Sequence, residues 1–328
     1  MADLLLELFS EEIPARMQAR AAADLERLMT TRLKEAGLKP EATESFVTPR
    51  RLTYVATGLP ERTDDVREER KGPRVGAPEK AVQGFLKSAG LASLDEATVQ
   101  EDKKGNFYVA VIERPGQATP AVVAEAVPAI IRDFPWPKSM RWGGLENDLR
   151  WVRPLRRILC VFGGEVVDFS VENGDRPIPS GDTTEGHRFL VPGEIQARSW
   201  DAYEERLTRA KVMLDPAQRR EHIAGEARAL CQAQGLELAE DDGLLAETAG
   251  LAEWPVPRIG KFGEEFLALP DEVLTASMKG HQKYFSVRDP KSGRLAPRFV
   301  AVANVEPKDG GAAMMERLSR AAGPRICP

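Results

Sequence analysis

The first part of the chain carries the pattern that most constrains its fold. Residues 3–9 form a short, mostly apolar run, which predicts a buried strand. Pro14 suits the first turn of a helix, and Gly37 is a typical residue just after a helix end. Between them, apolar residues recur at helical spacing: Met17, Ala21, Leu25, Leu28 and Ala36. Extended pieces at Phe46–Val47 and Leu52–Val55 complete a predicted strand–helix–strand–strand unit.

The chain has 328 residues, which is long enough for more than one domain. A single hydrophobic core rarely serves more than about 250–300 residues. We expect the strand–helix–strand–strand unit to occupy residues 1–60. Residues 61–80 are dense in glycine, proline and charges of both signs, which predicts a linker or an exposed arm. Residues 81–310 are expected to form a larger mixed region, followed by an atypical tail over 311–328.

Further elements follow from local patterns. We expect helices over 79–90, 119–134 and 199–213, and a strand over 107–113. Residues 173–193 are rich in glycine, proline, aspartate and threonine, which predicts a long loop. Strands and helices alternate without a regular βαβ rhythm, so the predicted fold class is α+β and multidomain.

Charge and cysteine content limit the function classes. The net charge is −5, so binding of nucleic acid by bulk charge is not expected and would need local patches. The only cysteines, Cys160, Cys231 and Cys327, lack zinc-ligand or redox spacing, and their scarcity fits a reducing cytosol without structural disulfides. The N-terminus resembles no targeting peptide, and no apolar run is long enough to span a bilayer. We therefore expect a cytoplasmic protein without membrane contact.

The segment 138–157 is a local concentration of positive charge. Its basic side chains outnumber its acidic ones by six to two: Lys138, Arg141, Arg150, Arg153, Arg156 and Arg157. Trp142 and Trp151 lie among them. Basic groups interleaved with aromatic rings suit a polyanion whose bases can stack. The alternative is a cationic strand and loop whose tryptophans pack in the core.

A second polar cluster follows the predicted helix at 270–279. Lys279, His281 and Lys283 could face a phosphate backbone. The alternative is a polar helix terminus, with Tyr284 and Phe285 in the core.

No complete catalytic constellation is present in the sequence. His187, His222 and His281 have no second ligand at metal spacing, so no metal site is expected. They are accompanied by no nucleophile motif, and the chain has no Walker loop, GxGxxG motif or class II synthetase signature. We therefore assign no catalytic residue to the chain.

The sequence nevertheless resembles a known family, the β subunit of bacterial heterotetrameric (α2β2) glycyl-tRNA synthetase, over its N-terminal part. The resemblance covers about residues 1–307, in family order. The matching stretches are LLLELFSEEIPARM (4–17), TPRRL (48–52), KGP (71–73), AVQGFLKSAGL (81–91), KSMRWG (138–143), WVRPLRRIL (151–159), GHRF (186–189), EWPVP (253–257), FLALPDEVLTASMKGHQKYFSV (266–287) and FVAVANVEP (299–307).

The resemblance implies a division of labour. The α subunit carries the class II active site and uses ATP and Mg²⁺, whereas the β subunit binds and positions tRNA(Gly). This chain would then have no cofactor of its own and would act in glycyl-tRNA aminoacylation as a ligase subunit. From charge and expected exposure, the candidate tRNA contacts are Arg50, Arg51, Lys138, Arg141, Trp142, Arg153, Arg156, Arg157, Lys279, His281 and Lys283.

One departure from the family concerns the end of the chain. Family members continue into an HD-like helical domain and an anticodon-binding domain, and here the sequence ends at Pro328. We therefore expect a truncated β subunit.

Two alternatives remain open. The chain could be an interaction module that docks the α subunit through residues 119–134 and the Trp254–Pro257 corner, with little RNA contact. It could also be a hydrolytic or editing domain that uses His187 or His281 as a base.

Overall fold

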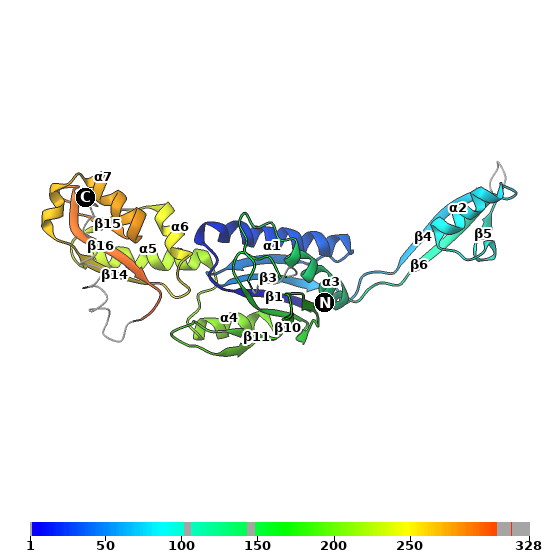
Figure 1. Cartoon of the computed structure of the whole chain (residues 1–328), viewed down its shortest axis with the longest axis horizontal. Helices are drawn as coiled ribbons and strands as arrows, with labels where there is room; N and C mark the ends of the chain where they lie inside the picture. The colour runs from blue at the N-terminus through cyan, green and yellow to red at the C-terminus, as the bar shows by residue number, and fades with distance from the viewer. Residues whose placement is uncertain (1, 102–105, 143–147, 307–315, 317–328) are drawn as a thin grey trace.

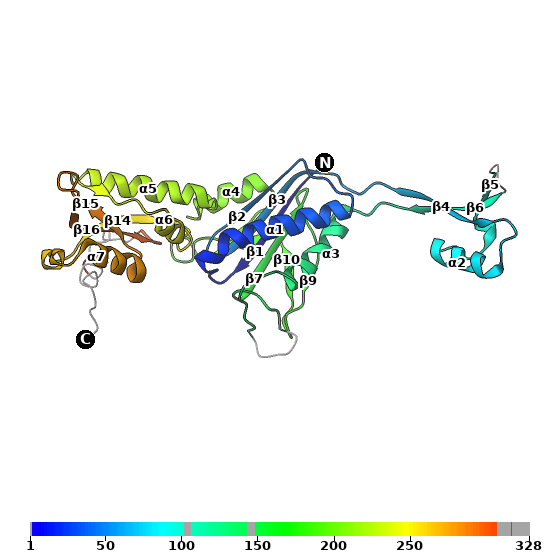
Figure 2. The ribbon, with the colours of Figure 1, turned by 90° about the horizontal axis from the view of Figure 1, so that it is seen from above.

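The computed structural model describes residues 2–101, 106–142, 148–306 and 316. The molecule is elongated, with a central sheet, a slender arm at one end and a second α/β unit at the other (Figures 1 and 2). Both helices and strands are abundant, and the sheets are mixed or antiparallel, which confirms the α+β class.

The central sheet contains seven strands. In chain order they are β1 (Ala2–Ser10), β2 (Ala42–Val47), β3 (Arg51–Leu59), β7 (Leu155–Phe162), β8 (Glu165–Val166), β9 (Ser170–Val171) and β10 (Ile178–Gly181). Their order in space is β2-β3-β1-β7-β10-β9, and β8 pairs with β7. The β7–β8 hairpin turns at Gly163 and Gly164, whose φ angles of 59° and 88° are those that a tight hairpin turn requires.

This sheet is buried on both faces, which explains the nearly continuous apolar run in β1. Leu4, Leu6 and Leu8 face the helices α1 (Ala15–Glu35) and α3 (Thr119–Arg132). Leu5 faces the opposite layer, where it packs with α4 (Trp200–Arg209). The hairpin β11 (Thr183–Glu185) and β12 (Glu194–Gln196) completes that layer. Alternation along a strand thus fills two cores with one run of leucines.

The expected unit of residues 1–60 is therefore part of a larger one. Strand β1 pairs with β7 from Leu4↔Phe162 to Ser10↔Leu155, so the two segments form one sheet. The expected strand–helix–strand–strand order is present as β1, α1, β2 and β3. Residues 173–193 were expected to form a long loop. In the structure they contain β10 and β11, which pair with neighbouring strands.

Residues 61–80, which were expected to form a linker or an exposed arm, belong to the projecting arm (Figures 1 and 2). Residues 61–80 contain β4 (Val66–Arg74), which pairs along its length with β6 (Phe107–Arg114). Strand β5 (Thr98–Gln100), η1 (Leu94–Glu96) and α2 (Glu79–Ala89) complete the arm. Its core is small, consisting mainly of Phe85, Ala89 and Ala110. The alternating charges suit such an arm, because strands that are exposed to water can carry charged side chains on their solvated face.

The C-terminal unit is a four-stranded sheet with helices on it. Its strands have the order β13-β15-β16-β14: β13 (Glu237–Leu238), β15 (Phe285–Arg288), β16 (Leu295–Ala303) and β14 (Val256–Lys261). The helices are α5 (Pro216–Gln232), α6 (Asp242–Ala249) and α7 (Asp271–Ser277), with the short turns η2 (Glu264–Ala268) and η3 (Met278–Gln282). Two apolar clusters hold this unit together, one under α5 and one under α7.

Among the residues that the structure describes, no helix combines the length and apolar character needed to cross a membrane. The tail over 311–328 lies outside the described residues except for Glu316.

Candidate nucleic-acid interface

In the basic segment 138–157, two stretches of the chain lie side by side. An isolated bridge pairs Met140 with Trp151, with N···O distances of 2.8 and 3.2 Å. Trp151 is fully buried and lies against Phe134 and Trp136, with ring centroids 5.0 Å away in each case. Packing in this aromatic cluster anchors the basic segment to the core of the central unit. For Trp151, the alternative of core packing is the one that the structure supports.

Four basic side chains of this segment lie at the protein surface. We call them the 138–153 patch: Lys138, Arg141, Arg150 and Arg153. All four are exposed. Within the described part of the chain, none of them forms an ion pair with a carboxylate. Arg150 donates to Ser139 Oγ at 3.3 Å, and Arg153 donates to the Val152 carbonyl at 2.8 Å. Their charges are therefore available to an external anion.

Arg156 and Arg157, by contrast, are neutralised by carboxylates. Arg156 donates from Nε and Nη2 to Glu11 at 2.9 and 2.8 Å. Arg157 contacts Glu194 and lies 3.4 Å from Glu185. Both arginines were expected to bind tRNA phosphates directly, and both already have anionic partners in this structure.

Glu11 organises a second cationic side chain that the sequence analysis did not single out. Arg188 contacts Glu11 at 2.5 Å and lies 3.8 Å from Glu12. Partial burial would raise the pKa of Glu11, but the hydrogen bonds from Arg156 and Arg188 outweigh it and lower that pKa. Arg188 stands in the GHRF stretch, but nothing in its local sequence shows that it meets residues so distant in the chain.

Arg50 and Arg51 have structural surroundings. Arg51 is fully buried, lies 3.2 Å from Glu7 and pairs with Glu253. Arg50 is 6% exposed, sits over the Phe9 ring at 4.4 Å and lies 3.8 Å from Glu185. A fully buried guanidinium cannot touch RNA, so the expected contact by Arg51 is wrong, and Arg50 is also poorly accessible. The expectation failed because a TPRR turn looks exposed in sequence, whereas here it is covered by residues from distant segments.

These buried charges belong to a network that joins the central sheet to the C-terminal unit. Thr48 donates to Glu253 at 2.7 Å, and Tyr203 contacts Glu7 through its hydroxyl. Burial raises the pKa of Glu7, because nearby Arg51 compensates only in part. Burial also acts on Glu253, but Arg51 and the Thr48 hydroxyl outweigh it and lower that pKa.

His187 contributes to the same joint. Its ring Nε2 donates to Asn304 Oδ1 at 3.0 Å, and Nδ1 accepts backbone N–H groups of Phe189 and Leu190 at 3.3 and 3.2 Å. His187 is 0% exposed. Both ring nitrogens are thus used inside the fold, which argues against His187 as an editing base.

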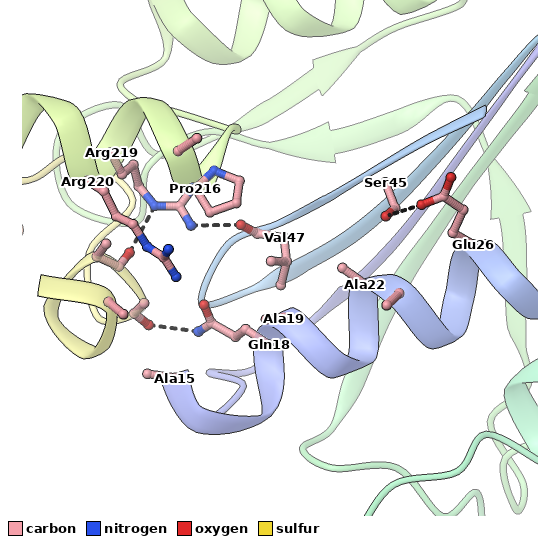
Figure 3. Close-up of a pocket in the computed structure, with 15 residues that line it drawn as sticks. Ala15, Gln18, Ala19, Ala22, Glu26, Ser45, Val47, Pro216, Arg219 and Arg220 are labelled. Atoms are coloured by element: carbon pink, nitrogen blue, oxygen red, sulfur yellow. Dashed lines mark hydrogen bonds between the residues drawn. The ribbon is translucent and has the colours of Figure 1, made fainter. Parts of the chain in front are cut away.

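Arg219 of α5 also contributes to the joint between the central sheet and the C-terminal unit. Its guanidinium donates to four backbone carbonyls, those of Val47, Met213, Leu214 and Ala249, at 2.7–2.9 Å. Gln18 of α1 similarly donates to Gly250 at 2.7 Å (Figure 3). Burial lowers the pKa of Arg219 to about 10, which leaves it charged at neutral pH. Polar contacts between distant segments therefore set how the two units meet.

A groove of about 330 Å³ lies over this joint, between α1 and the start of α5. Its walls carry several small side chains: Ala15, Ala19, Ala22, Ala23, Ala217, Ala246, Ala249 and Gly250. Figure 3 shows Arg220 extending over the space, with Glu26 at the far end held by Ser45 at 2.9 Å. Such a groove has room for a segment of another protein chain.

The expected second cluster lies in the C-terminal unit. Lys279 pairs with Asp241 at 2.6 Å, and Lys283 pairs with Glu247 at 3.0 Å. His281 is exposed. Tyr284 and Phe285 are buried, as in the alternative interpretation. The structure does not bring this cluster together with the 138–153 patch, because the two belong to different units (Figure 1).

Trp142 differs from Trp151 in being only partly buried. It lines a cavity of about 650 Å³ together with Arg156. The structure thus brings two predicted residues together at one cavity: the neutralised Arg156 and the accessible indole ring of Trp142.

Comparisons with known proteins identify the family of the chain. The family model described as glycyl-tRNA synthetase beta subunit matches residues 4–317. The chain is 53% identical over 319 residues to the glycine–tRNA ligase beta subunit of Dinoroseobacter shibae, covering 96% of this chain and 43% of that protein. It is 53% identical over 327 residues to the protein of the same name from Phenylobacterium zucineum, covering 99% and 47%. The Paracoccus denitrificans relative is 50% identical over 330 residues. The chain spans less than half the length of these curated relatives.

Proposed function

Since the chain belongs to the glycyl-tRNA synthetase β-subunit family, we propose that it binds tRNA(Gly) and positions it for glycylation by a separate α subunit. The α subunit would supply the active site and use ATP and Mg²⁺, in an α2β2 assembly in the cytoplasm. The chain itself would contribute binding. The chain spans less than half the length of its relatives. The proposal is therefore limited to roles that residues of this chain support.

One observation carries the proposal: the 138–153 patch is a group of exposed cations without carboxylate partners among the described residues. Elsewhere on this net acidic chain, many exposed arginines and lysines are paired, as Arg198 is with Asp182 and Arg228 with Glu240. Unpaired cations beside an accessible tryptophan suit phosphate and base together.

The test is the salt dependence of tRNA(Gly) binding. Each phosphate contact releases counterions, so loss of one contact flattens the slope of log affinity against log salt by about 1. We expect the triple variant K138Q/R141Q/R153Q to weaken binding and to flatten the slope by about 2–3. A matched control changes three exposed cations of the C-terminal unit, K261Q/K291Q/R294Q, which keeps the net charge change equal. Equal effects of the two triple variants would contradict the patch assignment.

A second candidate role is docking of the α subunit, which the groove in Figure 3 favours. The surfaces expected for docking from the sequence are less suitable. The apolar residues of α3, such as Val123, Val127 and Ile131, are buried against the central sheet. At the Trp254–Pro257 corner, the Trp254 ring is covered by Lys211 at 4.5 Å and donates to Glu306.

Filling the groove separates this role from tRNA binding. The variant A19W should abolish capture of the α subunit if the groove is the docking surface. Its tRNA affinity should stay unchanged, because Ala19 lies on α1, away from the patch. Retained capture with A19W would remove the groove from consideration.

A further inference from the structure

The cavity beside Trp142 lies where the basic segment meets the loop before β10. On one side it is bounded by Pro154, Leu155 and Arg156 at the start of β7. The other side is formed by residues 173–179, including Arg176, Pro177 and Pro179. Its volume of about 650 Å³ falls within the range of small-molecule sites. The cavity is therefore large enough for a planar heterocycle with its sugar.

The charges around the cavity balance one another. Arg156 and Arg176 line it, and so do the acids Asp148 and Asp175. Arg156 also has Glu11 as a partner. A phosphate would thus meet two carboxylates in addition to two guanidiniums. A neutral ring with donors and acceptors at its edge fits such a lining better, because it brings no charge that side chains of either sign would oppose.

The apolar part of the lining consists of flat and rigid groups. Trp142 packs one side against the core and contributes to the cavity wall, and three proline rings stand around it. Aromatic side chains are the usual platform for an unpaired base, because every base has a π face. Trp142 is half-buried and packs against the core, so only part of its ring surface is left for a ligand.

Two cations of the 138–153 patch are placed next to this wall. Arg141 directly precedes Trp142, and Arg153 directly precedes Pro154, so two exposed cations belong to residues that neighbour the cavity lining in sequence. The bridge between Met140 and Trp151 keeps the two stretches together. Phosphates on either side of an inserted base would then have exposed cations within a residue of the cavity wall, while the base enters a lining whose opposite charges balance.

We propose that this cavity receives a single unpaired base of a bound RNA, stacked on Trp142, with the adjoining phosphates on Arg141 and Arg153. This inference rests on the proposed tRNA-binding function and adds to it a site for an unstacked nucleotide. It also divides the labour among the residues: the cations supply attraction that depends on salt, and the indole supplies stacking that does not.

The experiment compares three RNAs: a tRNA(Gly) transcript, a single-stranded dodecamer, and a blunt duplex of the same length. We expect W142A to weaken binding of the first two about tenfold with an unchanged salt slope, since stacking does not release counterions. Binding of the blunt duplex should be unaffected. W142F should retain most of the affinity, and the half-buried tryptophan of the C-terminal unit gives the matched control W254A.

A second variant keeps the proposal testable if W142A folds poorly. P179W fills the cavity from the opposite wall, where Pro179 is exposed, and leaves Trp142 in place. It should reproduce the selective loss for RNA with unpaired bases. Wild-type affinity of both W142A and P179W for all three RNAs would overturn the base site, as would an equal loss for the duplex. In either case the triple patch variant still reports on the proposed function. If the wild-type chain bound none of the RNAs, the proposed function would fail first.

Discussion

The guanidinium of Arg51 and the carboxylate of Glu253 form an ion pair between side chains that are 0% and 3% exposed, across 202 residues of sequence. Arg51 begins β3 of the central sheet, and Glu253 precedes β14 of the C-terminal unit. The pair therefore couples the packing of one unit to the other. Since Glu7 also lies 3.2 Å from Arg51, one cation serves two buried acids.

Removing the central cation should destabilise the protein strongly. In R51M, Glu7 and Glu253 would lose their shared buried partner, and breaking a buried pair in this way costs about 3–5 kcal/mol. Urea denaturation measures this as a fall in the midpoint at constant slope. The exposed arginine variant R294M is the control and should change the free energy of unfolding by less than about 0.5 kcal/mol. A loss for R51M as small as that of the control would show that the buried pair contributes little.

The two acids should respond to pH in opposite directions. The pKa of Glu7 is raised in the folded state, so its contribution to stability is complete below the unfolded pKa of about 4.3 and falls as pH rises through the folded pKa. The pKa of Glu253 is lowered, so its contribution is present above about 4.3 and is lost as pH falls through the folded pKa. Relative to wild type, E7Q should therefore gain stability as pH rises from 4 to 8.

E253Q provides the comparison for that experiment. Its disadvantage relative to wild type should be largest near neutral pH and should shrink below about pH 4.3. Unfolding free energies from urea titrations at several pH values supply both differences. Parallel curves for E7Q and E253Q would contradict the opposite pKa shifts.

The joint should also depend on Arg219, whose guanidinium serves carbonyls from both units. In R219M, the buried carbonyls of Val47 and Ala249 would lose a charged donor, at a cost of about 3 kcal/mol. R219K should rescue little, because an ammonium cannot reach acceptors spread around a planar fork. Limited proteolysis should detect earlier cleavage between the central sheet and α5 in both variants. R220M, at the adjacent exposed position, is the matched control and should be cleaved like wild type.

Local elements could be read from the sequence where one physical signal dominated. The helix expected at 79–90 is α2 (Glu79–Ala89), and the strand expected at 107–113 is β6 (Phe107–Arg114). Helix α3 forms despite Pro128, because its buried residues, among them Val127 and Ile131, pack on the central sheet. Packing against distant elements can outweigh the local cost of a proline.

The site was harder to predict, because charge alone does not reveal a partner. Nothing within 138–157 indicates that Glu11 neutralises Arg156, since 145 residues separate them. The burial of Arg51 likewise depends on Glu253, far away in sequence. Sequence reasoning therefore found the cationic segment but could not divide its members into paired and available. That division needs the antiparallel pairing of β1 with β7.

Substitution of the two tryptophans of the basic segment should lower the stability of the protein by different amounts. Trp151 is 0% exposed and packs on Phe134 and Trp136, so W151A should cost about 3–5 kcal/mol through a large cavity. Trp142 is only partly buried, so W142A should cost about 1 kcal/mol. Thermal or urea unfolding of the two variants gives the comparison. Similar losses would mean that Trp142 is as much a core residue as Trp151.

Glu11 offers the sharpest functional prediction, because it holds two arginines at the edge of the candidate interface. In E11Q, Arg156 and Arg188 would lose their shared carboxylate and become available to phosphate. We therefore expect tighter tRNA(Gly) binding at low salt and a salt slope steeper by about 1–2. The folded-state pKa of Glu11 is lowered, so wild type should approach E11Q in affinity as pH falls through that pKa, when the carboxyl becomes neutral. E205Q removes an exposed acid paired with Arg209 on α4 and serves as the control, since it changes the net charge equally. If E11Q bound tRNA no more tightly than E205Q, the paired arginines would have no share in the interface.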